Sequence, residues 1–574
     1  VARYGYPTRW RAHRMGPAWA GTDVDDETIG LVEPRVTRRG VAEVLAIGAA
    51  ATYALFKAPR TLLALRARIP TEQTIFVGPD DDDDCETIGE AVAVAGPHVT
   101  IRVAKGTYRE SLVVRNGVAI VARKGHRVKI APPSGPAITV VGGDPLIKDV
   151  VLLASPTPAP GDDGVAPAIR ITGGSPTVRD CEIHGAGGDG VRVSGADTVA
   201  TVVGTVIRGP AGACQTTEPA SAGVWFDDGT GGTVESCTIH LSGAAWMGVH
   251  VGAGTNPIVR DTKVISETGG VGVRVGPGGG GTFERCAVQA RVGMTVDRGH
   301  PMVRASEFSN CDAPLEVTGP GGGTYEKCMF GGYSLGIRLT EEASPVFDTC
   351  NVFAVDLGVV MGEGVNPFFF RTGMSTGLGE ALVAESGARG RLAQCKLHRN
   401  LHTAAELQRV DPNHASTVSL GKHSSTQFEN CTISGSVGPG VVVAAFGGGT
   451  FTDSVIRANG GPGMVVGVGA TPMVHGGEIV GNGNVGVHVL NGGGGTFVSC
   501  AICANDSSGL HLEAGADPVV RSCQITGNGH HGVVVGAGAI GRITDCIIGD
   551  NALGDWLIDR DARVQLSGNT PTSA

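Results

Sequence analysis

Residues 494–502 read GGTFVSCAI, and this phrase returns with small changes along much of the chain. The other copies are GGTVESCTI (231–239), GGTFERCAV (280–288), GGTYEKCMF (322–330), GGTFTDSVI (448–456) and a degenerate GRITDCII (541–548). A phosphate loop would need a following helix and usually a lysine beside the glycines, whereas Thr-Phe follows here. Self-similarity at a fixed period instead indicates a repeat architecture.

A second phrase, which begins around a proline, alternates with the first. Its copies are SPTVRDCEI (175–183), NPIVRDTKV (256–264), HPMVRASEF (300–308), SPVFDTCNV (344–352), NPFFFRTGM (366–374), TPMVHGGEI (471–479) and DPVVRSCQI (517–525). Pro257, Pro301 and Pro345 are 44 residues apart, and Pro472 and Pro518 are 46 apart. The glycine phrase falls about halfway between prolines, so one coil has roughly 22 to 25 residues.

A third segment, a glycine followed by alternating apolar residues, lies between the two phrases. Its copies are DGVRVSGA (189–196), MGVHVGAG (247–254), VGVRVGPG (271–278), LGIRLTEE (335–342), VGVHVLNG (485–492), SGLHLEAG (508–515) and HGVVVGAG (531–538). Period-two alternation bounded by Gly, Asn and Asp indicates short strands with tight corners. Because like segments recur one coil apart, they predict a parallel solenoid, with coils about 4.8 Å apart and a rod on the order of 100 Å long.

The alternation also predicts which side chains face the interior. Val, Ile and Leu of this third segment should fill the core, because successive side chains of a strand point to opposite faces. The residues between them should point outward on one face of the rod: His250, Arg274, Arg338, His488 and His511.

The start of the rod has its own pattern. Residues 86–95 place Ile88, Ala91, Val92 and Ala95 at helical spacing, and three strand-like segments follow up to residue 130. A solenoid needs such a cap, since its first coil would otherwise leave an unpaired edge and an open core. We therefore expect a helix over residues 86–95 that closes the N-terminal end.

Two known families resemble these segments. The entry segment, IGEAVAVA followed by IRVAKGTYRE and GVAIVA, looks like that of pectin-lyase-like parallel β-helix proteins. The alternating coils are similar to the β-helix region of F-box-only ubiquitin-ligase adaptors and of NosD-like proteins. The resemblance covers about residues 72–560 and implies an all-β, single-stranded, right-handed parallel β-helix. It implies little about activity, because this fold carries lyases, hydrolases, esterases and binding rods.

Composition agrees with this fold class and limits the function. The chain has 92 glycines among 574 residues, 17% charged and 5% aromatic residues, with no Gly-X-Y period. It is too apolar for disorder and is not collagen-like. A net charge of -10 argues against a nucleic-acid partner, which would require a basic patch.

Most cysteines occupy one place in the repeat, two residues before the apolar residue that ends a phrase. These are Cys181, Cys237, Cys286, Cys328, Cys350, Cys395, Cys431, Cys500, Cys523 and Cys546. We expect them to stack as a buried ladder of reduced thiols, which favours a reducing, intracellular compartment. The CAIC of residues 500–503 has no second pair for zinc and lies on an expected strand, so we assign it neither a metal nor a redox role.

The N-terminal 70 residues differ in kind from the repeat. Residues 44–56 carry no charge, but this run is shorter than the roughly 20 residues that span a bilayer. We expect a short helical extension that packs on the rod or lies at a surface. The alternative is membrane contact through residues 40–58, with Lys57, Arg60 and Arg66 as basic anchors.

The chain is thus divided into an extension (1–70), a β-helix (71–560) and a C-terminal tail (561–574). Within the β-helix, residues 375–425 break the period, and RNLHTAAELQRVDPNHAS (399–416) is polar and partly helical in pattern. We expect a surface insertion there. If the rod has a local function, it should lie where the repeat fails, around 375–425 or before residue 86.

Several acidic and basic residues partly match the catalytic or metal sites known on this fold. The run PDDDDDC (79–85) is expected to be a solvated loop rather than a Ca²⁺ site, because consecutive side chains diverge. Asp162-Asp163, Asp227-Asp228 and His530-His531-Gly532 are partial matches to inverting hydrolases, but the only Arg-x-Lys, Arg127 to Lys129, precedes them. Arg260, Arg304, Asp180, Asp261 and Asp348 recur from coil to coil, which favours a structural role for them.

The sequence therefore predicts a non-enzymatic solenoid that presents an extended surface to a protein, for example a ubiquitin-ligase substrate, or to a glycan. It names no catalytic residue, metal ligand, cofactor or individual binding residue. Two alternatives stay open: a polysaccharide lyase or glycoside hydrolase, and a structural subunit tethered to a membrane by the N-terminal extension.

Overall fold

The computed structural model describes residues 74–158, 165–209, 221–227, 229–242, 246–266, 269–399 and 415–571. The chain divides into two compact units, Val1–Thr71 and Glu72–Ala574, and the described residues all belong to the second. The expected N-terminal extension, including residues 40–58, lies outside the described residues. Among the described residues, no helix has the length and apolar character needed to cross a bilayer.

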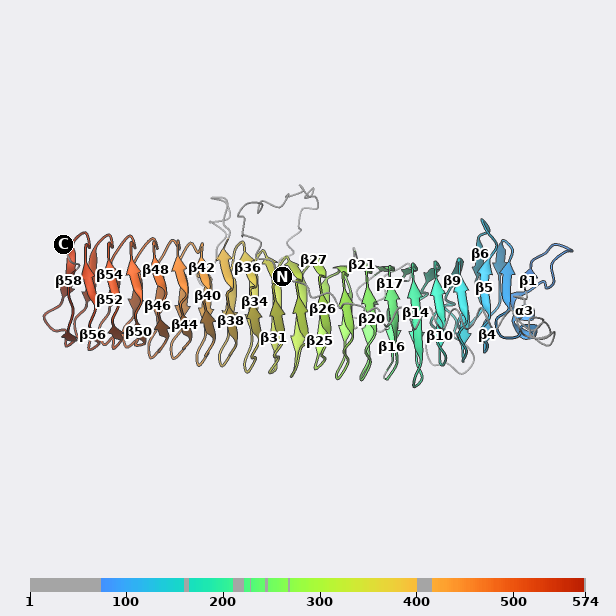
Figure 1. Ribbon diagram of the computed structural model, residues 1–574, viewed down its shortest axis with the longest axis horizontal. Helices are drawn as coiled ribbons and strands as arrows, with labels where there is room; N and C mark the ends of the chain where they lie inside the picture. The colour runs from blue at the N-terminus through green and yellow to red at the C-terminus, as the bar shows by residue number, and fades with distance from the viewer. Residues whose placement is uncertain are drawn as a thin grey trace, which may run out of the picture. The chain divides into compact units, whose positions relative to one another are not determined.

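The second unit is a stack of coils in which each coil supplies one strand to each of three parallel sheets (Figure 1). Sheet A runs from β1 (Thr74–Val77) to β59 (Gln565–Ser567) and contains 21 strands of the described chain. Sheet B runs from β3 (Gly106–Tyr108) to β57 (Ile547–Gly549), and sheet C from β4 (Leu112–Val114) to β58 (Gly554–Ile558). The predicted right-handed parallel β-helix is confirmed.

The opening phrase shows how one coil is built. GGTFVSCAI contains β50 (Thr496–Val498) of sheet A and the start of β51 (Ala501–Cys503) of sheet B, and β52 (Leu510–Leu512) of sheet C follows. Ser499, between β50 and β51, has a φ of 55°, and Ala504, after β51, has a φ of 51°. Each corner therefore needs one residue in the left-handed region, which turns the chain sharply between two strands.

The interior is apolar and stacked in register, as the alternation predicts. Val487 and Val489 are fully buried, whereas His488 between them faces outward and pairs in register with His511 of the next coil. Aromatic rings also stack inside sheet A: the centroids of Phe347 and Phe369 are 4.6 Å apart and their planes differ by 6°. Identical positions thus form ladders, and where two successive coils both carry an interior ring the rings stack.

The predicted cap helix is present as α3 (Ile88–Val94) at the N-terminal end of the stack (Figure 1). Thr87 accepts a hydrogen bond from the backbone N–H of Glu90, and the Glu90 side chain accepts one from the backbone N–H of Thr87. This capping box satisfies backbone donors that the first turn leaves free. Ile88 and Ala91 are fully buried in the core, so the helix closes the end of the coil stack.

The repeat is interrupted over a shorter range than the sequence indicated. β37 (Leu382–Ala384), β38 (Arg391–Ala393) and β39 (Lys396–Arg399) pair with the coils on both sides, as does β40 (Val418–Leu420). The expectation of a broken period across 375–425 was therefore wrong for these strands. Strand register is therefore kept on both sides of residues 400–414, which lie outside the described residues.

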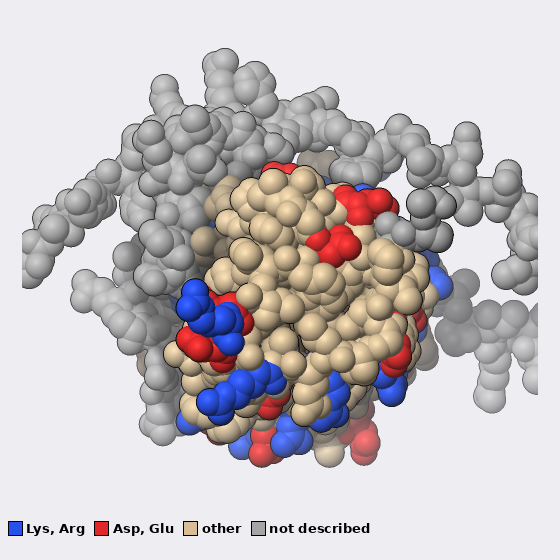
Figure 2. Space-filling view, turned by 90° about the vertical axis from the view of Figure 1, so that its left-hand side faces the viewer, with Lys and Arg blue, Asp and Glu red and all other residues tan. Residues whose placement is uncertain are grey.

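The C-terminal end of the described chain continues the stack. β59 pairs in register with β56 (Arg542–Thr544), although it lies within residues 561–574, which we expected to form a tail. Seen along the rod from this end, the surface is mostly uncharged, and Lys, Arg, Asp and Glu lie mainly around its rim (Figure 2).

Candidate functional site

The cysteine ladder is structural. All ten of its members are buried free thiols, and their side chains lie at the corner between sheets A and B. Cys500 shows the pattern, with Sγ 3.5 Å from the Val474 carbonyl oxygen of the previous coil and 3.3 Å from that of Val498. Burial raises the pKa of Cys237 and of Cys286 to about 11. Such thiols are poor nucleophiles, because the thiolate is the reactive form.

A second ladder was missed by the sequence analysis. Asn459, Asn482, Asn505, Asn528 and Asn551 are buried at the corner between sheets B and C. Asn505 Oδ1 accepts hydrogen bonds from the backbone N–H and the Nδ2 of Asn482, and Asn505 Nδ2 donates to the next asparagine and to a backbone carbonyl. The signal was present as five asparagines 23 residues apart.

The two cysteines of CAIC lie at different corners of the coil. Cys500 is buried in the ladder, whereas Cys503 ends β51 and is partly exposed. No group of three or more His, Cys, Asp or Glu residues in the described part of the chain is arranged to hold a metal ion.

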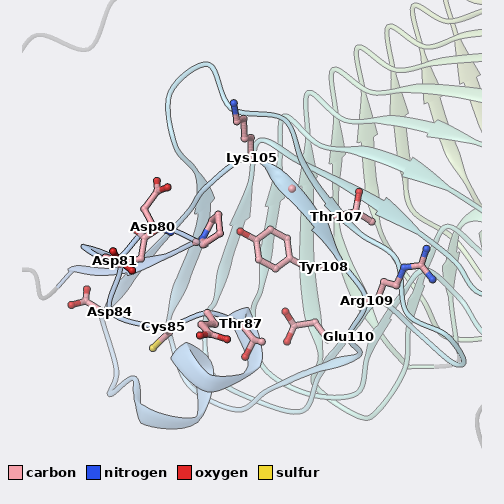
Figure 3. Close-up of a pocket in the computed structure, with 15 residues that line it drawn as sticks. Asp80, Asp81, Asp84, Cys85, Thr87, Lys105, Thr107, Tyr108, Arg109 and Glu110 are labelled. Atoms are coloured by element: carbon pink, nitrogen blue, oxygen red, sulfur yellow. The ribbon is translucent and has the colours of Figure 1, made fainter.

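A cavity of about 900 Å³ lies at the N-terminal end, between the acidic loop and β3 (Figure 3). Tyr108 lies at its centre and donates a hydrogen bond to the Ala104 carbonyl oxygen, while Asp80 and Asp81 lie at one side and are exposed. Burial raises the pKa of Tyr108. The run 79–85 thus forms a loop whose first aspartates are in solvent.

The other carboxylates around this cavity hold the cap together. Glu110 accepts hydrogen bonds from the backbone N–H groups of Ile88 and Gly89 at the start of α3, at 2.9 and 2.8 Å. Asp84 accepts one from the Phe76 N–H at 2.8 Å, and Asp83 forms an ion pair with Arg123. Since these groups anchor backbone donors and the first coil, they do not converge on a ligand.

The recurring arginines of sheet A are ion-paired along the rod. Arg260 lies 2.8 Å from Glu235 of the previous coil, and Arg304 lies 2.9 Å from Glu326 of the next. Opposite charges that face each other across neighbouring strands stabilise the sheet modestly. These positions therefore set strand register and leave little net charge on this part of sheet A.

On sheet C, a charged side chain and an aromatic side chain stack on a tryptophan, and this is the only such stack in the described residues. Trp225, in β16 (Ser221–Phe226), has the Arg192 guanidinium 4.9 Å from its ring on one side and the His250 ring 3.9 Å away on the other. Arg192 and His250 belong to the coils before and after it. Both faces of the indole are therefore covered, and Trp225 cannot offer a ring face to a ligand.

Two carboxylates in this cluster are bound to the same arginine. Asp227 accepts two hydrogen bonds from Arg192, each 3.0 Å long, and one from Trp225 Nε1 at 2.8 Å. The Asp189 side chain is only 5% exposed, accepts from the Ala222 N–H at 2.7 Å, and has a pKa raised by burial to about 6. Because Asp189 is buried and Asp227 is held by Arg192, this pair does not form two carboxylates flanking an open sugar site.

Sheet B, by contrast, carries an uncharged and exposed surface that we call the aromatic face: Met329, Tyr333, Phe353 and Val355. They lie in or just after β30 (Met329–Gly332) and β33 (Asn351–Ala354), and Tyr333 and Phe353 are 55% and 46% exposed. In the register of sheet B, Phe353 stands between Gly331 of β30 and Ser375 of β36 (Gly373–Thr376). Since both ladder neighbours are small, the coils on either side leave the Phe353 ring open.

The family follows from these coils and their residues. The model of the right-handed β-helix region matches residues 167–300 and 416–570, about half of the chain. The protein belongs to the right-handed β-helix family. No curated protein matches the chain.

Solved β-helix structures are similar at low identity. The A-module of the mannuronan C-5 epimerase AlgE4 from Azotobacter vinelandii is 11% identical, with 66% of this chain and 89% of that chain covered and a TM-score of 0.25. The pectate lyase Pel9A is 12% identical, with 58% and 79% covered and a TM-score of 0.24. The catalytic domain of a GH87 alpha-1,3-glucanase is 9% identical, with 63% and 65% covered and a TM-score of 0.27. Values this low support no inference about a shared site.

Proposed function

We propose that this β-helix is a non-enzymatic binding protein whose aromatic face binds a glycan. The observation that carries the proposal is the position of Phe353, an exposed ring with Gly331 and Ser375 as its ladder neighbours. At Trp225, by contrast, the coils before and after cover both ring faces.

An open phenyl face suits the C–H groups of a pyranose ring. The face of an aromatic ring is electron-rich, so weakly positive C–H bonds pack against it. The surroundings supply neutral hydrogen-bonding groups: Asn351 is exposed on the same strand, and the Tyr333 hydroxyl lies 3.3 Å from Asn310 Oδ1. Neutral polar groups around a single aromatic platform match the hydroxyl pattern of a glycan better than they match a charged partner.

A protein partner is the second candidate, and Met329 and Val355 favour it. Both are exposed, and together with Tyr333 and Phe353 they form a contiguous apolar surface without an intervening charge. Methionine and aromatic residues are enriched at the centres of protein interfaces. A glycan would depend on the open ring of Phe353, whereas a protein would depend on the whole apolar area.

The decisive variant is Gly331→Val, which covers the Phe353 ring without removing it. A Cβ at Gly331 would meet nothing closer than the Phe308 carbonyl oxygen at 3.6 Å, so a side chain fits there without displacement. Valine also favours a strand. The matched control is Thr526→Val, an isosteric change at the same place in sheet B on a distant coil.

Binding would be measured on a glycan array, followed by titration calorimetry with the best ligand. We expect Gly331→Val and Phe353→Ala each to weaken glycan binding at least tenfold, while Thr526→Val binds as the parent and all three melt at the parent temperature. No glycan binding by the parent, or full binding by Gly331→Val, would refute the proposal. Loss of binding to a defined protein on substitution of Met329 and Val355 would instead support the second candidate.

A further inference from the structure

A second cavity, of about 460 Å³, lies on sheet A, whereas the aromatic face lies on sheet B. It is formed by three successive strands: β35 (Phe368–Phe370), β38 (Arg391–Ala393) and β41 (Gln427–Glu429). From each coil the lining includes a residue before the strand and the residue at its start, together with Pro367 and Gly390 from the first two coils. The pairs are Asn366 and Phe368, Arg389 and Arg391, and Ser425 and Gln427.

The lining of this cavity is positively charged. It contains two arginines and no aspartate or glutamate, although the chain as a whole has a net charge of -10. Arg389 is exposed and forms no ion pair with the described residues. Arg391 is held in place, since its Nε and Nη2 donate to the two Glu429 carboxylate oxygens at 3.1 and 2.7 Å.

Arg389 is charged at a register position that is neutral in the coils on either side. Backbone hydrogen bonds place it in line with Asn366 of the coil before it and Ser425 of the coil after it, and with Ser344 and Gly448 beyond them. A register position that is neutral in the neighbouring coils does not need an arginine for packing. The charge at this position is therefore available for a ligand.

An apolar wall stands beside the charge. Phe368 is partly exposed at the edge of the cavity, and the Arg391 guanidinium lies 5.4 Å from its ring centre. A guanidinium that rests on an aromatic ring keeps a fixed orientation. The cavity thus combines four kinds of group. They are the Arg389 guanidinium, which forms no ion pair with the described residues; the Arg391 guanidinium, which Glu429 orients; the Phe368 ring; and the neutral polar ends of Ser425 and Gln427.

We propose that this cavity binds a small carboxylate that carries an apolar ring. The carboxylate accepts two parallel hydrogen bonds from Arg389, which is the geometry that a planar guanidinium offers to a planar anion. The ring of the ligand packs beside Phe368, and Ser425 or Gln427 donates to a remaining carboxylate lone pair. Because this site lies on sheet A, ligand binding here can be tested independently of glycan binding on sheet B.

The probe is 4-fluorophenylacetate, observed by ¹⁹F NMR while the full chain is titrated. Its neutral analogue, 4-fluorophenylacetamide, has the same ring without the charge. We expect saturable binding of the acid and at least tenfold weaker binding of the amide. Equal binding of the two compounds, or no binding of the acid at millimolar concentration, would overturn the proposal.

Three variants locate the site. Arg389→Gln should weaken binding of the acid at least tenfold, and Phe368→Leu should weaken it severalfold. The matched control is Arg542→Gln, because Arg542 is an exposed arginine at the start of a sheet A strand, and its Nε donates a hydrogen bond to Gln565 Oε1 at 3.1 Å. Unchanged affinity in Arg389→Gln, or equal loss in Arg542→Gln, would refute the assignment, and thermal melting confirms that each variant folds.

Discussion

The asparagine ladder predicts that Asn505→Ala is strongly destabilising, although residue 505 touches no ligand surface. Its side chain makes four hydrogen bonds: from the Asn482 N–H at 3.1 Å, from Asn482 Nδ2 at 2.9 Å, to the Ile479 carbonyl at 3.1 Å and to Asn528 Oδ1 at 3.0 Å. Alanine removes all four and leaves the buried N–H of Asn482 without an acceptor.

The expected loss in free energy of unfolding depends on which hydrogen bonds the former partners of Asn505 keep. The orphaned N–H costs about 1–3 kcal/mol, and the three groups that retain other partners lose about 0.5–1 kcal/mol each, which together give about 2.5–6 kcal/mol. Because each coil of a solenoid contacts only its neighbours, this loss should appear as local opening of the coils around residues 479–528.

Hydrogen exchange measured by mass spectrometry on the native protein resolves this opening by segment. Peptides from residues 169–193, many coils away, serve as the internal reference. Cys500→Ser is the matched control in the same coil, since Ser306 and Ser454 occupy the same ladder place and donate to the same kind of carbonyl. We expect the control to cost less than about 1 kcal/mol. If Asn505→Ala changed the opening free energy no more than Cys500→Ser does, the ladder argument would be refuted.

Three further predictions rest on other features. Iodoacetamide at pH 8 should label the partly exposed Cys85 and Cys503 in the native protein and leave the ten ladder cysteines unmodified until unfolding, because the ladder side chains are buried and the reagent cannot reach them. Burial also raises the pKa of Cys181 to about 12 and that of Cys237 to about 11, so rapid native labelling of Cys237, read by peptide mapping, would contradict this prediction. The pKa of Asp189 is raised from 3.8 to about 6, so the folded state binds a proton more tightly than the unfolded state, and stability due to this group is present below pH 4 and lost as the pH rises through 6. Urea titrations of Asp189→Asn should therefore show less loss of stability between pH 4 and pH 7 than the parent shows. If the unfolding free energies of the variant and the parent changed in parallel with pH, this role of Asp189 would be wrong. Ala305 has a φ of 46° at a corner, so Ala305→Gly should raise stability by about 0.5–1 kcal/mol; a lower melting temperature would contradict the corner strain.

Local patterns were sufficient for the fold and for its N-terminal end. The three phrases recur with one period, and alternation within them separates interior valines from outward residues such as His488. The cap helix followed from apolar spacing after Thr87, and the cysteine ladder from the constant place of Cys in the phrase. These features depend on residues that are close together in the chain or repeat at one interval.

The errors came from features that one copy of the repeat does not reveal. Single asparagines beside glycines read as ordinary turn residues, so the hydrogen-bonded ladder from Asn459 to Asn551 was missed. The strands around residues 382–399 looked irregular because their phrase, RGRLAQCKL (389–397), keeps a single glycine and has Arg391 where the glycine phrase has threonine, yet β38 still pairs with β35 and β41. Backbone hydrogen bonds between coils tolerate such substitutions, because they do not depend on side chains.

The sequence by itself determined the right-handed β-helix, because each coil repeats the same alternation of buried and exposed residues with the same corners. Only the tertiary structure decided which surface is available. Whether Phe353 or Trp225 can meet a ligand depends on residues more than 20 positions away, Gly331 and Ser375 in one case and Arg192 and His250 in the other. In a stack with a short coil-to-coil distance, the neighbouring coil either covers a ring or leaves it open.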